Sequence, residues 1–238
     1  MKTVPLRSRT TAQVAAEWDQ MAPIRARQLK RGIDHSALHV LGPAISTLVG
    51  RAPSIVDVGC GTGWLTNILS NRADKVIGVD PSHVSIALAR HAVKKENVSF
   101  VNASIEEYVK TNQLVFSIAV ANMTLGTVSS LSGTLRAIKR SLAANGHLVF
   151  TVSHPCFWPI YWGYAEAPWF RYGNEIAVAA PFRISAEGTA MVTTHVHRPL
   201  EQYFAVLRST GFDLEEFQEL TGEGFALPRF IAIRCMKL

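Results

Sequence analysis

Short apolar segments alternate with amphipathic segments through the middle of the chain, and this alternation constrains the fold most strongly. Apolar runs rich in β-branched residues predict buried strands, and amphipathic runs predict helices. The predicted strands are Ser54–Val58, Lys75–Asp80, Val98–Ser104, Leu114–Met123 and His147–His154. The predicted helices between them are 63–71, 81–95 and 131–146, the last ending at Gly146. Such alternation predicts an α/β fold, a doubly wound, mostly parallel Rossmann-like sheet with helices on both faces.

The segments that flank this core divide the chain into four parts. Residues 1–49 predict an N-terminal helical cap, and residues 50–152 form the α/β core. Residues 153–197 interrupt the alternation as an insertion after the fifth strand of the core, and residues 198–238 complete the core with a helix and two strands.

Prolines and glycines modify the predicted cap. Its first helix covers Val14–Leu29, and Pro23 is expected to bend or split it, because proline removes a backbone donor. Its second helical stretch, His35–Val49, is interrupted at Gly42-Pro43.

The insertion, called the lid below, has an unusual content of aromatic residues. Cys156–Tyr172 holds eight of the 21 aromatic residues of the chain. A hairpin is expected after it, with its turn at Glu187-Gly188. The aromatic residues have two interpretations: a wall over a substrate pocket, or a second small core beneath the hairpin.

Composition narrows the class of protein. The chain has 238 residues, 48% hydrophobic and 18% charged, which is typical of a globular protein. No apolar run reaches the roughly 20 residues that span a bilayer, and no apolar core follows the basic N-terminus as in a secretory signal. Cys60, Cys156 and Cys235 are far apart, which argues against a disulfide framework or a structural zinc site and fits a reducing cytoplasm. The net charge of +6 is not gathered in a dense basic run, so a solvated surface is favoured over a nucleic-acid groove.

A glycine-rich loop follows the first strand of the core. Gly59, Gly61 and Gly63 allow positive φ angles and close approach of a ligand to the backbone, and the following helix offers free N–H donors. The pattern is G-C-G-T-G-W, with Trp64 where a dinucleotide loop has its third glycine, and no G-K-S/T follows. Asp80 ends the second strand, where its carboxylate can accept both hydroxyls of a ribose. The site is therefore expected to bind a nucleoside without a pyrophosphate.

These motifs resemble those of the class I S-adenosylmethionine-dependent methyltransferases, in their ubiquinone/menaquinone-type small-molecule branch. The resemblance rests on "VDVGCGTG" followed by "VIGVDPS", with "VSFVNASIEEY", "FSIAVANMTLGTV" and "LRAIKRSLAANGHLVF" in the family's order. It covers about residues 50–155 and, less closely, 197–238. It implies the class I methyltransferase fold, S-adenosyl-L-methionine as the cofactor and a small-molecule methyl acceptor.

The resemblance also implies roles for individual residues. The glycine loop would border the methionine part of the cofactor, Asp80 would hold the ribose, and Asn122 and Met123 would lie beside the sulfonium. Ser104 stands where many relatives have an aspartate that accepts from the adenine amino group. The implied cofactor-binding residues are Gly59, Cys60, Gly61, Thr62, Gly63, Asp80, Pro81, Ser82, Ala103, Ser104, Ile105, Asn122 and Met123.

Methyl transfer from a sulfonium is an in-line displacement that needs a general base only when the acceptor arrives protonated. His154, at the carboxyl end of the fifth strand of the core, is the candidate catalytic base; the alternative is that it only bonds to backbone. His195 and His197 share a strand face, but no third ligand is evident, so no metal site is expected. The candidate substrate-binding residues are Trp18, Phe157, Trp158, Tyr161, Trp162 and Trp169.

The function predicted from the sequence is methyl transfer from S-adenosylmethionine to a small aromatic or apolar molecule. Two alternatives remain open: an RNA (tRNA) base methyltransferase, which the basic net charge favours, and a non-catalytic S-adenosylmethionine-binding regulatory protein. No membrane span and no nucleic-acid partner are expected, and the sequence determines neither the acceptor atom nor the oligomeric state.

Overall fold

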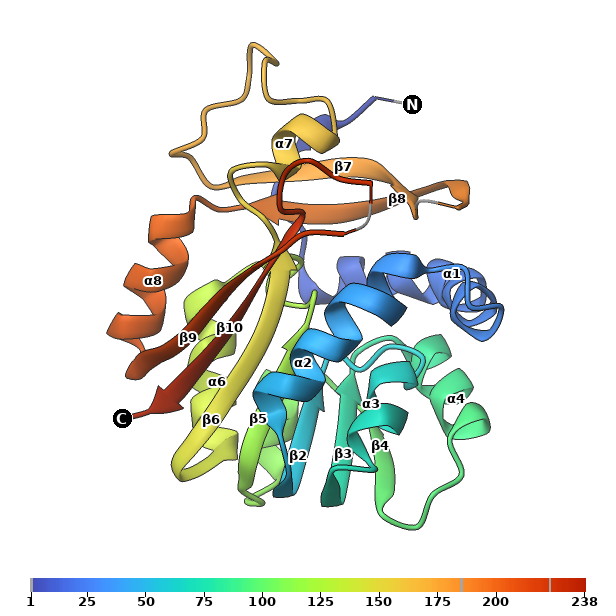
Figure 1. Cartoon of the computed structure of the whole chain (residues 1–238), viewed down its shortest axis with the longest axis vertical. Coiled ribbons are helices and arrows are strands. Elements are labelled where there is room, and N and C mark those ends of the chain that lie inside the picture. The colour runs from blue at the N-terminus through green and yellow to red at the C-terminus, as the bar shows by residue number, and fades with distance from the viewer. Residues whose placement is uncertain (1, 185, 223) are drawn as a thin grey trace.

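A seven-stranded sheet forms the centre of the molecule in the computed structural model, which describes residues 2–184, 186–222 and 224–238 (Figure 1). Its strand order is β4-β3-β2-β5-β6-β10-β9. Neighbours from β4 to β6 are parallel, whereas β10 is antiparallel to both β6 and β9. The predicted mostly parallel, doubly wound sheet is confirmed. Its strands are β2 (Ala52–Val58), β3 (Ala73–Asp80), β4 (Val98–Asn102), β5 (Phe116–Asn122), β6 (Leu142–Ser153), β9 (Phe212–Leu220) and β10 (Phe230–Lys237).

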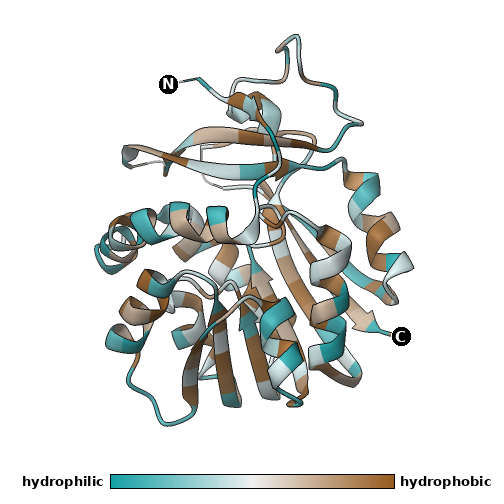
Figure 2. Ribbon diagram, turned by 180° about the vertical axis from the view of Figure 1, so that it is seen from behind, coloured by the Kyte–Doolittle hydropathy of each residue, from teal (hydrophilic) through white to brown (hydrophobic). Residues whose placement is uncertain are grey.

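Helices cover both faces of this sheet, which explains why its strands read as nearly continuous apolar runs. One face packs against α5 (Ile105–Thr111), α6 (Leu131–Ser141) and α8 (Leu200–Ser209), and the other against α2 (Gly42–Val49) and α3 (Trp64–Leu69). In β2, Val56 faces the first set of helices and Ile55 the second, and both side chains are fully buried. Figure 2 shows the same arrangement as apolar strands enclosed by helices with polar outer surfaces.

At the edge of the sheet, α4 (His83–Ala92) packs Ile86 and Ala89 against Phe100 of β4. Ser82 is the N-cap of this helix, as predicted, and its hydroxyl accepts a hydrogen bond from the Ser85 N–H at 3.1 Å.

Helix α1 (Thr11–Lys30) lies above the carboxyl ends of the parallel strands and packs against α4 and β8. It starts in a capping box in which Thr10 and Gln13 bond to each other's backbone N–H. It runs through Pro23 without a break, so the expected split is wrong. Met21 and Ala22, both buried beside the proline, hold the helix in place where one backbone hydrogen bond is lost.

The second part of the cap changes helix type where an interruption was expected. A π-helical segment, η1 (Ser36–Leu41), leads into α2, which begins at Gly42 with Pro43 in its first turn. Proline suits this first-turn position because its fixed φ angle matches that of a helix.

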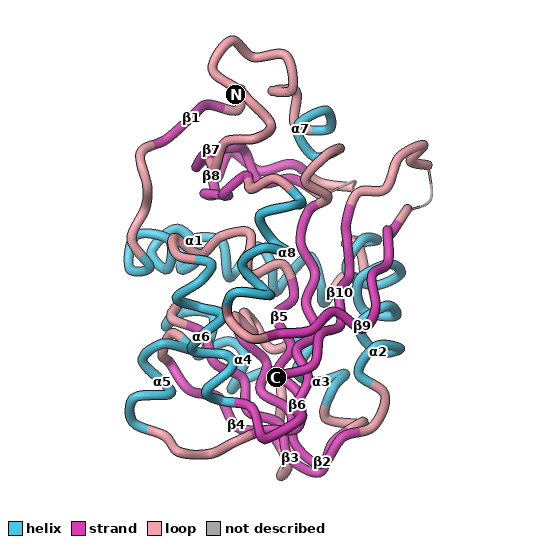
Figure 3. Tube along the Cα trace, turned by 90° about the vertical axis from the view of Figure 1, so that its left-hand side faces the viewer, coloured by secondary structure: helices cyan, strands magenta, loops and turns pink. Residues whose placement is uncertain are grey.

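The lid forms a second, smaller sheet over α1 (Figures 1 and 3). The expected hairpin is present and consists of β7 (Ile176–Arg183) and β8 (Gly188–His197). Its turn lies earlier than the predicted Glu187-Gly188, because Gly188 already pairs with Arg183 and the Ile184 N–H donates to the Glu187 carbonyl at 2.9 Å. A strand that the sequence did not predict, β1 (Val4–Leu6), pairs with β7, so residues 1–49 are not purely a helical cap. A short helix, α7 (Trp158–Tyr161), lies in the first part of the lid.

The predicted end of the helix over residues 131–146 is also wrong. Helix α6 stops at Ser141, and β6 already begins at Leu142, which pairs with Phe116 of β5. Asn145 has a φ angle of 57° inside this irregular start of the strand. Among the helices of the described residues, none combines the length and apolarity needed to cross a membrane.

Candidate active site

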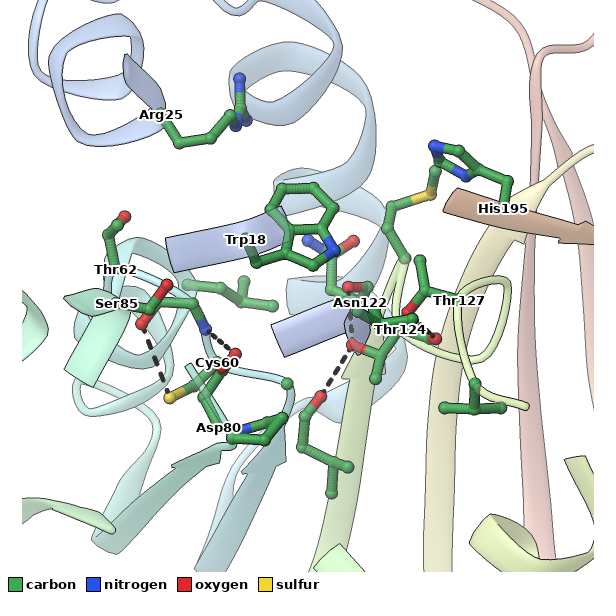
Figure 4. Close-up of a pocket in the computed structure, with 18 of the residues that line it drawn as sticks. Trp18, Arg25, Cys60, Thr62, Asp80, Ser85, Asn122, Thr124, Thr127 and His195 are labelled. Atoms are coloured by element: carbon green, nitrogen blue, oxygen red, sulfur yellow. Dashed lines mark hydrogen bonds between the residues drawn. The ribbon is translucent and has the colours of Figure 1, made fainter. Parts of the chain in front are cut away.

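A cavity of about 320 Å³ opens where the parallel strands end, between the sheet, α1 and the lid (Figure 4). Open α/β sheets bind ligands at this edge, and the volume is in the range of small-molecule sites. The Trp18 ring extends from α1 into the cavity, between Cys60 and Asn122 in Figure 4.

The first two glycines of the loop are required for different reasons. Gly59 has a φ angle of 69°, and a Cβ there would lie 2.3 Å from the Thr124 Oγ1. Gly61 has a φ angle of 53°, but a Cβ there would meet no described atom within 4 Å and would project into open space. Gly59 therefore allows two loops to pack closely, whereas Gly61 leaves free space at the cavity.

Asp80 is held at the cavity wall by two backbone groups. Its Oδ2 accepts the Gly61 N–H at 2.9 Å, and its Oδ1 accepts the Ser82 N–H at 2.8 Å. Burial raises the pKa of Asp80 to about 6, although these two hydrogen bonds act in the opposite direction. The carboxylate thus has a fixed orientation, with its remaining acceptor capacity available to a ligand.

A second carboxylate, Asp57, lines the same cavity from β2. Burial raises its pKa to about 7, partly offset by the hydrogen bond that Thr66 donates to its Oδ2 at 2.6 Å. The sequence reasoning did not single out Asp57, although it stands two residues before Gly59 in the same motif.

The adenine side of the expected site is built on the N-terminus of α5. Ser104 is its N-cap: the Ser104 Oγ accepts the Glu107 N–H at 3.2 Å, and the Glu107 carboxylate accepts the Ser104 N–H at 2.8 Å. Ser104 and Ile105 both line the cavity.

Asn122 and Met123 lie where β5 ends. The Asn122 Oδ1 accepts the Thr151 hydroxyl at 2.7 Å, and Met123 has a φ angle of 57°, which is unusual for a residue with a side chain. The Met123 N–H is held by the Thr151 carbonyl at 3.0 Å. The sheet therefore imposes this conformation at the cavity edge, as is common at functional sites.

The lid aromatics combine both interpretations. Trp158 and Trp162 line the cavity, but Trp162 is also buried in a separate cluster with Tyr164 and Phe170. Trp169 stacks on Tyr164, with ring centroids 5.5 Å apart. The lid thus has a small core of its own, and two members of its aromatic set face the cavity.

His154 is not on the cavity wall. Its Nδ1 accepts the Cys156 N–H at 3.2 Å, so Nε2 carries the proton and donates to the Glu219 Oε1 at 2.8 Å. Its side chain is 2% exposed. With both ring nitrogens occupied, this geometry fits the structural alternative and leaves His154 without access to a substrate in the cavity.

Comparison with known proteins identifies the family. A family model described as a methyltransferase domain matches residues 17–214. The chain belongs to this methyltransferase family. The predicted membership of the class I S-adenosylmethionine-dependent methyltransferases is thereby confirmed.

The matches to the curated relatives cover only part of each relative's length. A malonyl-acyl-carrier-protein O-methyltransferase of Acetivibrio thermocellus is 34% identical over 116 residues, 48% of this chain and 40% of the relative. A ubiquinone biosynthesis O-methyltransferase of Alkalilimnicola ehrlichii is 28% identical over 116 residues, 48% of this chain and 46% of the relative. The chain therefore spans less than half the length of these two relatives.

A solved structure agrees in fold. The 1,6-didemethyltoxoflavin-N1-methyltransferase of Burkholderia thailandensis, crystallised with its substrate and S-adenosylhomocysteine, has a TM-score of 0.66 at 16% identity, covering 99% of this chain and 94% of that chain. At this identity the likeness supports the fold alone.

The methyltransferase cavity brings together most of the residues singled out in the sequence. Ten of the implied cofactor residues line it: Gly59, Cys60, Gly61, Thr62, Asp80, Pro81, Ser104, Ile105, Asn122 and Met123. Three candidate substrate residues also line it: Trp18, Trp158 and Trp162.

Three implied cofactor residues act behind the wall instead. Gly63 packs against Ala89 and Phe100. Ser82 is fully buried, and its hydroxyl donates to Asp19 of α1 at 2.7 Å. The Ala103 N–H donates to the Asp80 carbonyl at 3.1 Å.

Three candidate substrate residues likewise point elsewhere. Phe157 packs on the His154 ring at 4.4 Å, Trp169 belongs to the lid core, and the Tyr161 hydroxyl donates to the Leu227 carbonyl at 2.7 Å.

The cavity also contains residues that the sequence reasoning did not place there. His195 lines it from β8, with its Nε2 3.2 Å from the Thr193 Oγ1 and the Trp162 ring edge-on at 4.6 Å. Burial lowers the pKa of His195 to about 4, so its ring is neutral at pH 7. Arg183 and Arg229 line the cavity too. The described residues contain no cluster of three His, Cys, Asp or Glu side chains able to hold a metal ion.

Proposed function

We propose that this protein transfers a methyl group from S-adenosylmethionine to a small-molecule acceptor that lies under the lid. The observation that supports this most directly is the continuity of one cavity from the glycine loop and Asp80 to Trp158 and Trp162 of the lid. A cofactor and an acceptor can therefore share one enclosed space, as an in-line displacement requires.

In this proposal, the chain's own residues bind, orient and exclude water. Asp80 accepts hydrogen bonds from the ribose, and Ser104 and Ile105 border the adenine. Asn122 and Met123 border the reacting centre. The cofactor, when bound, supplies an activated methyl group on a sulfonium. Trp18, Trp158 and Trp162 keep water from that centre, which favours a displacement in which the charged sulfonium becomes a neutral thioether leaving group.

The proposed division of labour follows the four parts of the chain. Residues 1–49 cap the site, 50–152 bind the cofactor, 153–197 cover the acceptor, and 198–238 complete the sheet. A reducing compartment, the cytoplasm, fits the three cysteines, none of which forms a disulfide: Cys60 and Cys235 are buried and Cys156 is exposed.

Ligand-induced stabilisation tests the cofactor assignment. A ligand that binds only the folded state increases the free energy of unfolding by mass action, by about 2.7 kcal/mol at a hundredfold excess over Kd. The melting temperature rises as a result. We expect S-adenosylmethionine and S-adenosylhomocysteine to raise it and NADH to leave it unchanged. Equal stabilisation by NADH would refute the assignment. Release of S-adenosylhomocysteine during a screen of small-molecule acceptors then tests catalysis against the non-catalytic alternative.

A further inference from the structure

Two guanidinium groups in the cavity are not neutralised. Arg183 ends β7 of the lid, and Arg229 stands directly before β10. Neither forms an ion pair with a carboxylate of the described residues. The third arginine of the wall, Arg25, differs, because it bonds to Asp34 at 2.6 Å and to the Gln28 side chain at 2.7 Å.

Arg229 is held rigidly at the wall. Its N–H donates to the Leu220 carbonyl at 3.0 Å, and its own carbonyl accepts the His154 N–H at 2.8 Å. Its backbone is thereby fixed to the ends of β9 and β6. The segment that carries His154 thus supports Arg229.

The Arg229 side chain lies among aromatic rings. Its Cζ is 4.1 Å from the ring centroid of Phe225, 5.3 Å from Tyr161 and 5.5 Å from Trp158. These rings stabilise the cation through their faces but accept little from its N–H groups in the guanidinium plane. The Nε is buried and has no hydrogen-bond partner in the described part of the chain. Buried donors without a partner are rare in native proteins, so the described residues leave this guanidinium incompletely satisfied.

Arg183 and Arg229 are close enough to influence each other electrostatically. Burial lowers the pKa of Arg229, and Arg183 acts in the same direction while Tyr161 and Asp34 act in the opposite one, yet an arginine remains protonated at neutral pH. The two carboxylates of the cofactor side, Asp57 and Asp80, end β2 and β3 instead. Since β2 is separated from β10 by β5 and β6, at about 4.8 Å per strand, β10, which Arg229 precedes, runs about 14 Å to the side of the strand that leads into the glycine loop.

We propose that the methyl acceptor carries a carboxylate, which Arg229 binds together with Arg183 while Trp158 contacts the apolar part of the molecule. This inference rests on the proposed function and names the acceptor's chemical class. A guanidinium matches the planar geometry of a carboxylate with two parallel hydrogen bonds. A carboxylate could also come from the cofactor's methionine part, but the separation of the arginine corner from β2 favours the acceptor.

Benzoate and benzamide are the probes, because they have nearly the same shape and differ in charge. With S-adenosylhomocysteine at saturation, we expect benzoate to raise the melting temperature and benzamide to have no effect. In calorimetric titrations, Arg229→Gln should weaken benzoate binding at least tenfold and leave the Kd of S-adenosylhomocysteine within twofold. The matched control is Arg208→Gln, which removes an exposed arginine of α8 and should change neither affinity.

The outcomes separate the hypotheses. If S-adenosylhomocysteine fails to bind, the proposed function is wrong; if it binds and benzoate and benzamide behave alike, only the anion site is wrong. Benzoate that competes with S-adenosylhomocysteine would assign the arginines to the cofactor and overturn the inference. Should Arg229→Gln unfold, Arg183→Gln tests the same pocket, and unchanged benzoate affinity there would overturn the inference equally.

Discussion

Asp80 should make cofactor binding depend on pH. Its two oxygens are fixed by the Gly61 and Ser82 N–H groups, and it has no paired cation among the described residues to keep it ionised. Burial raises its pKa from the ordinary value of 3.8 to about 6 in the folded protein. Ionised Asp80 therefore destabilises the free protein, a penalty that is absent below about pH 4 and complete once the pH exceeds about 6.

The ligand reverses this preference, because ribose hydroxyls donate to the ionised carboxylate. Affinity for S-adenosylhomocysteine should be constant above pH 7 and should fall below about pH 6, by up to about tenfold per pH unit. Asp80→Asn offers only one acceptor oxygen, so its amide N–H₂ must face either the Gly61 or the Ser82 N–H. Losing a hydrogen bond to a charged group costs about 1.5–3 kcal/mol, which corresponds to a Kd roughly 10–150-fold higher at pH 7.5.

Isothermal titration with S-adenosylhomocysteine between pH 5 and 8 measures both effects. Asp80→Asn should have the weakened affinity and a flatter pH profile. Burial raises the pKa of Asp57 to about 7, so Asp57 also changes its protonation in this pH range. Asp57→Asn removes that second change and leaves the effect of Asp80 alone. Asp74→Asn, an exposed position of the same strand, is the control. Wild-type affinity in Asp80→Asn at pH 7.5, or a wild-type Kd that does not change from pH 8 to 5, would refute this reasoning.

Three further substitutions test the site. Gly61→Ala should fold, at a backbone cost of about 1–2 kcal/mol, but lose S-adenosylhomocysteine binding in a titration. Gly59→Ala should lower the melting temperature more strongly than Gly61→Ala, because its Cβ would lie 2.3 Å from the Thr124 Oγ1. A lower melting temperature for Gly61→Ala than for Gly59→Ala would contradict this assignment. His154→Phe should destabilise the fold by about 1–3 kcal/mol and keep the cofactor Kd, and a changed pH profile of methyl transfer would instead restore His154 as a base. Trp162→Ala should cost about 3–5 kcal/mol in denaturant unfolding, because the ring is part of the lid core, and an unchanged unfolding midpoint would show that it only lines the cavity.

The central strands β2, β3 and β5 were predictable because most of their residues are buried and they read as apolar runs. The failures occur where pairing across the chain overrides local preference. Residues 142–146 favour a helix locally, yet Leu142 pairs with Phe116 and starts β6. The three residues of β1 are too few to show a period, and they form a strand only because β7 lies beside them.

The cofactor side of the site was predictable for a related reason. Parallel strands bring their carboxyl ends to one edge of a sheet, so a loop after β2 and an acid ending β3 must meet. The Gly61 N–H and the Asp80 carboxylate are indeed hydrogen-bonded, although 19 residues separate them. His195, Arg183 and Arg229 come from the hairpin and from the segment before β10. Their positions depend on how the lid folds over the sheet, and an arginine outside regular structure is usually exposed.

His154 behind the cavity wall, His195 on it and the two cavity arginines together favour an anionic acceptor whose reacting atom arrives without a proton. A protonated phenol or alcohol needs a base whose pKa lies near the working pH. His154 has both ring nitrogens occupied, and burial holds the pKa of His195 near 4, so neither is matched to that task. The reacting atom of the acceptor is therefore expected to need no base, and the carboxylate, which is ionised at neutral pH, anchors the acceptor at the arginines. Arg183 and Arg229 supply the positive charge that such an acceptor requires, and an in-line displacement then needs only alignment and exclusion of water.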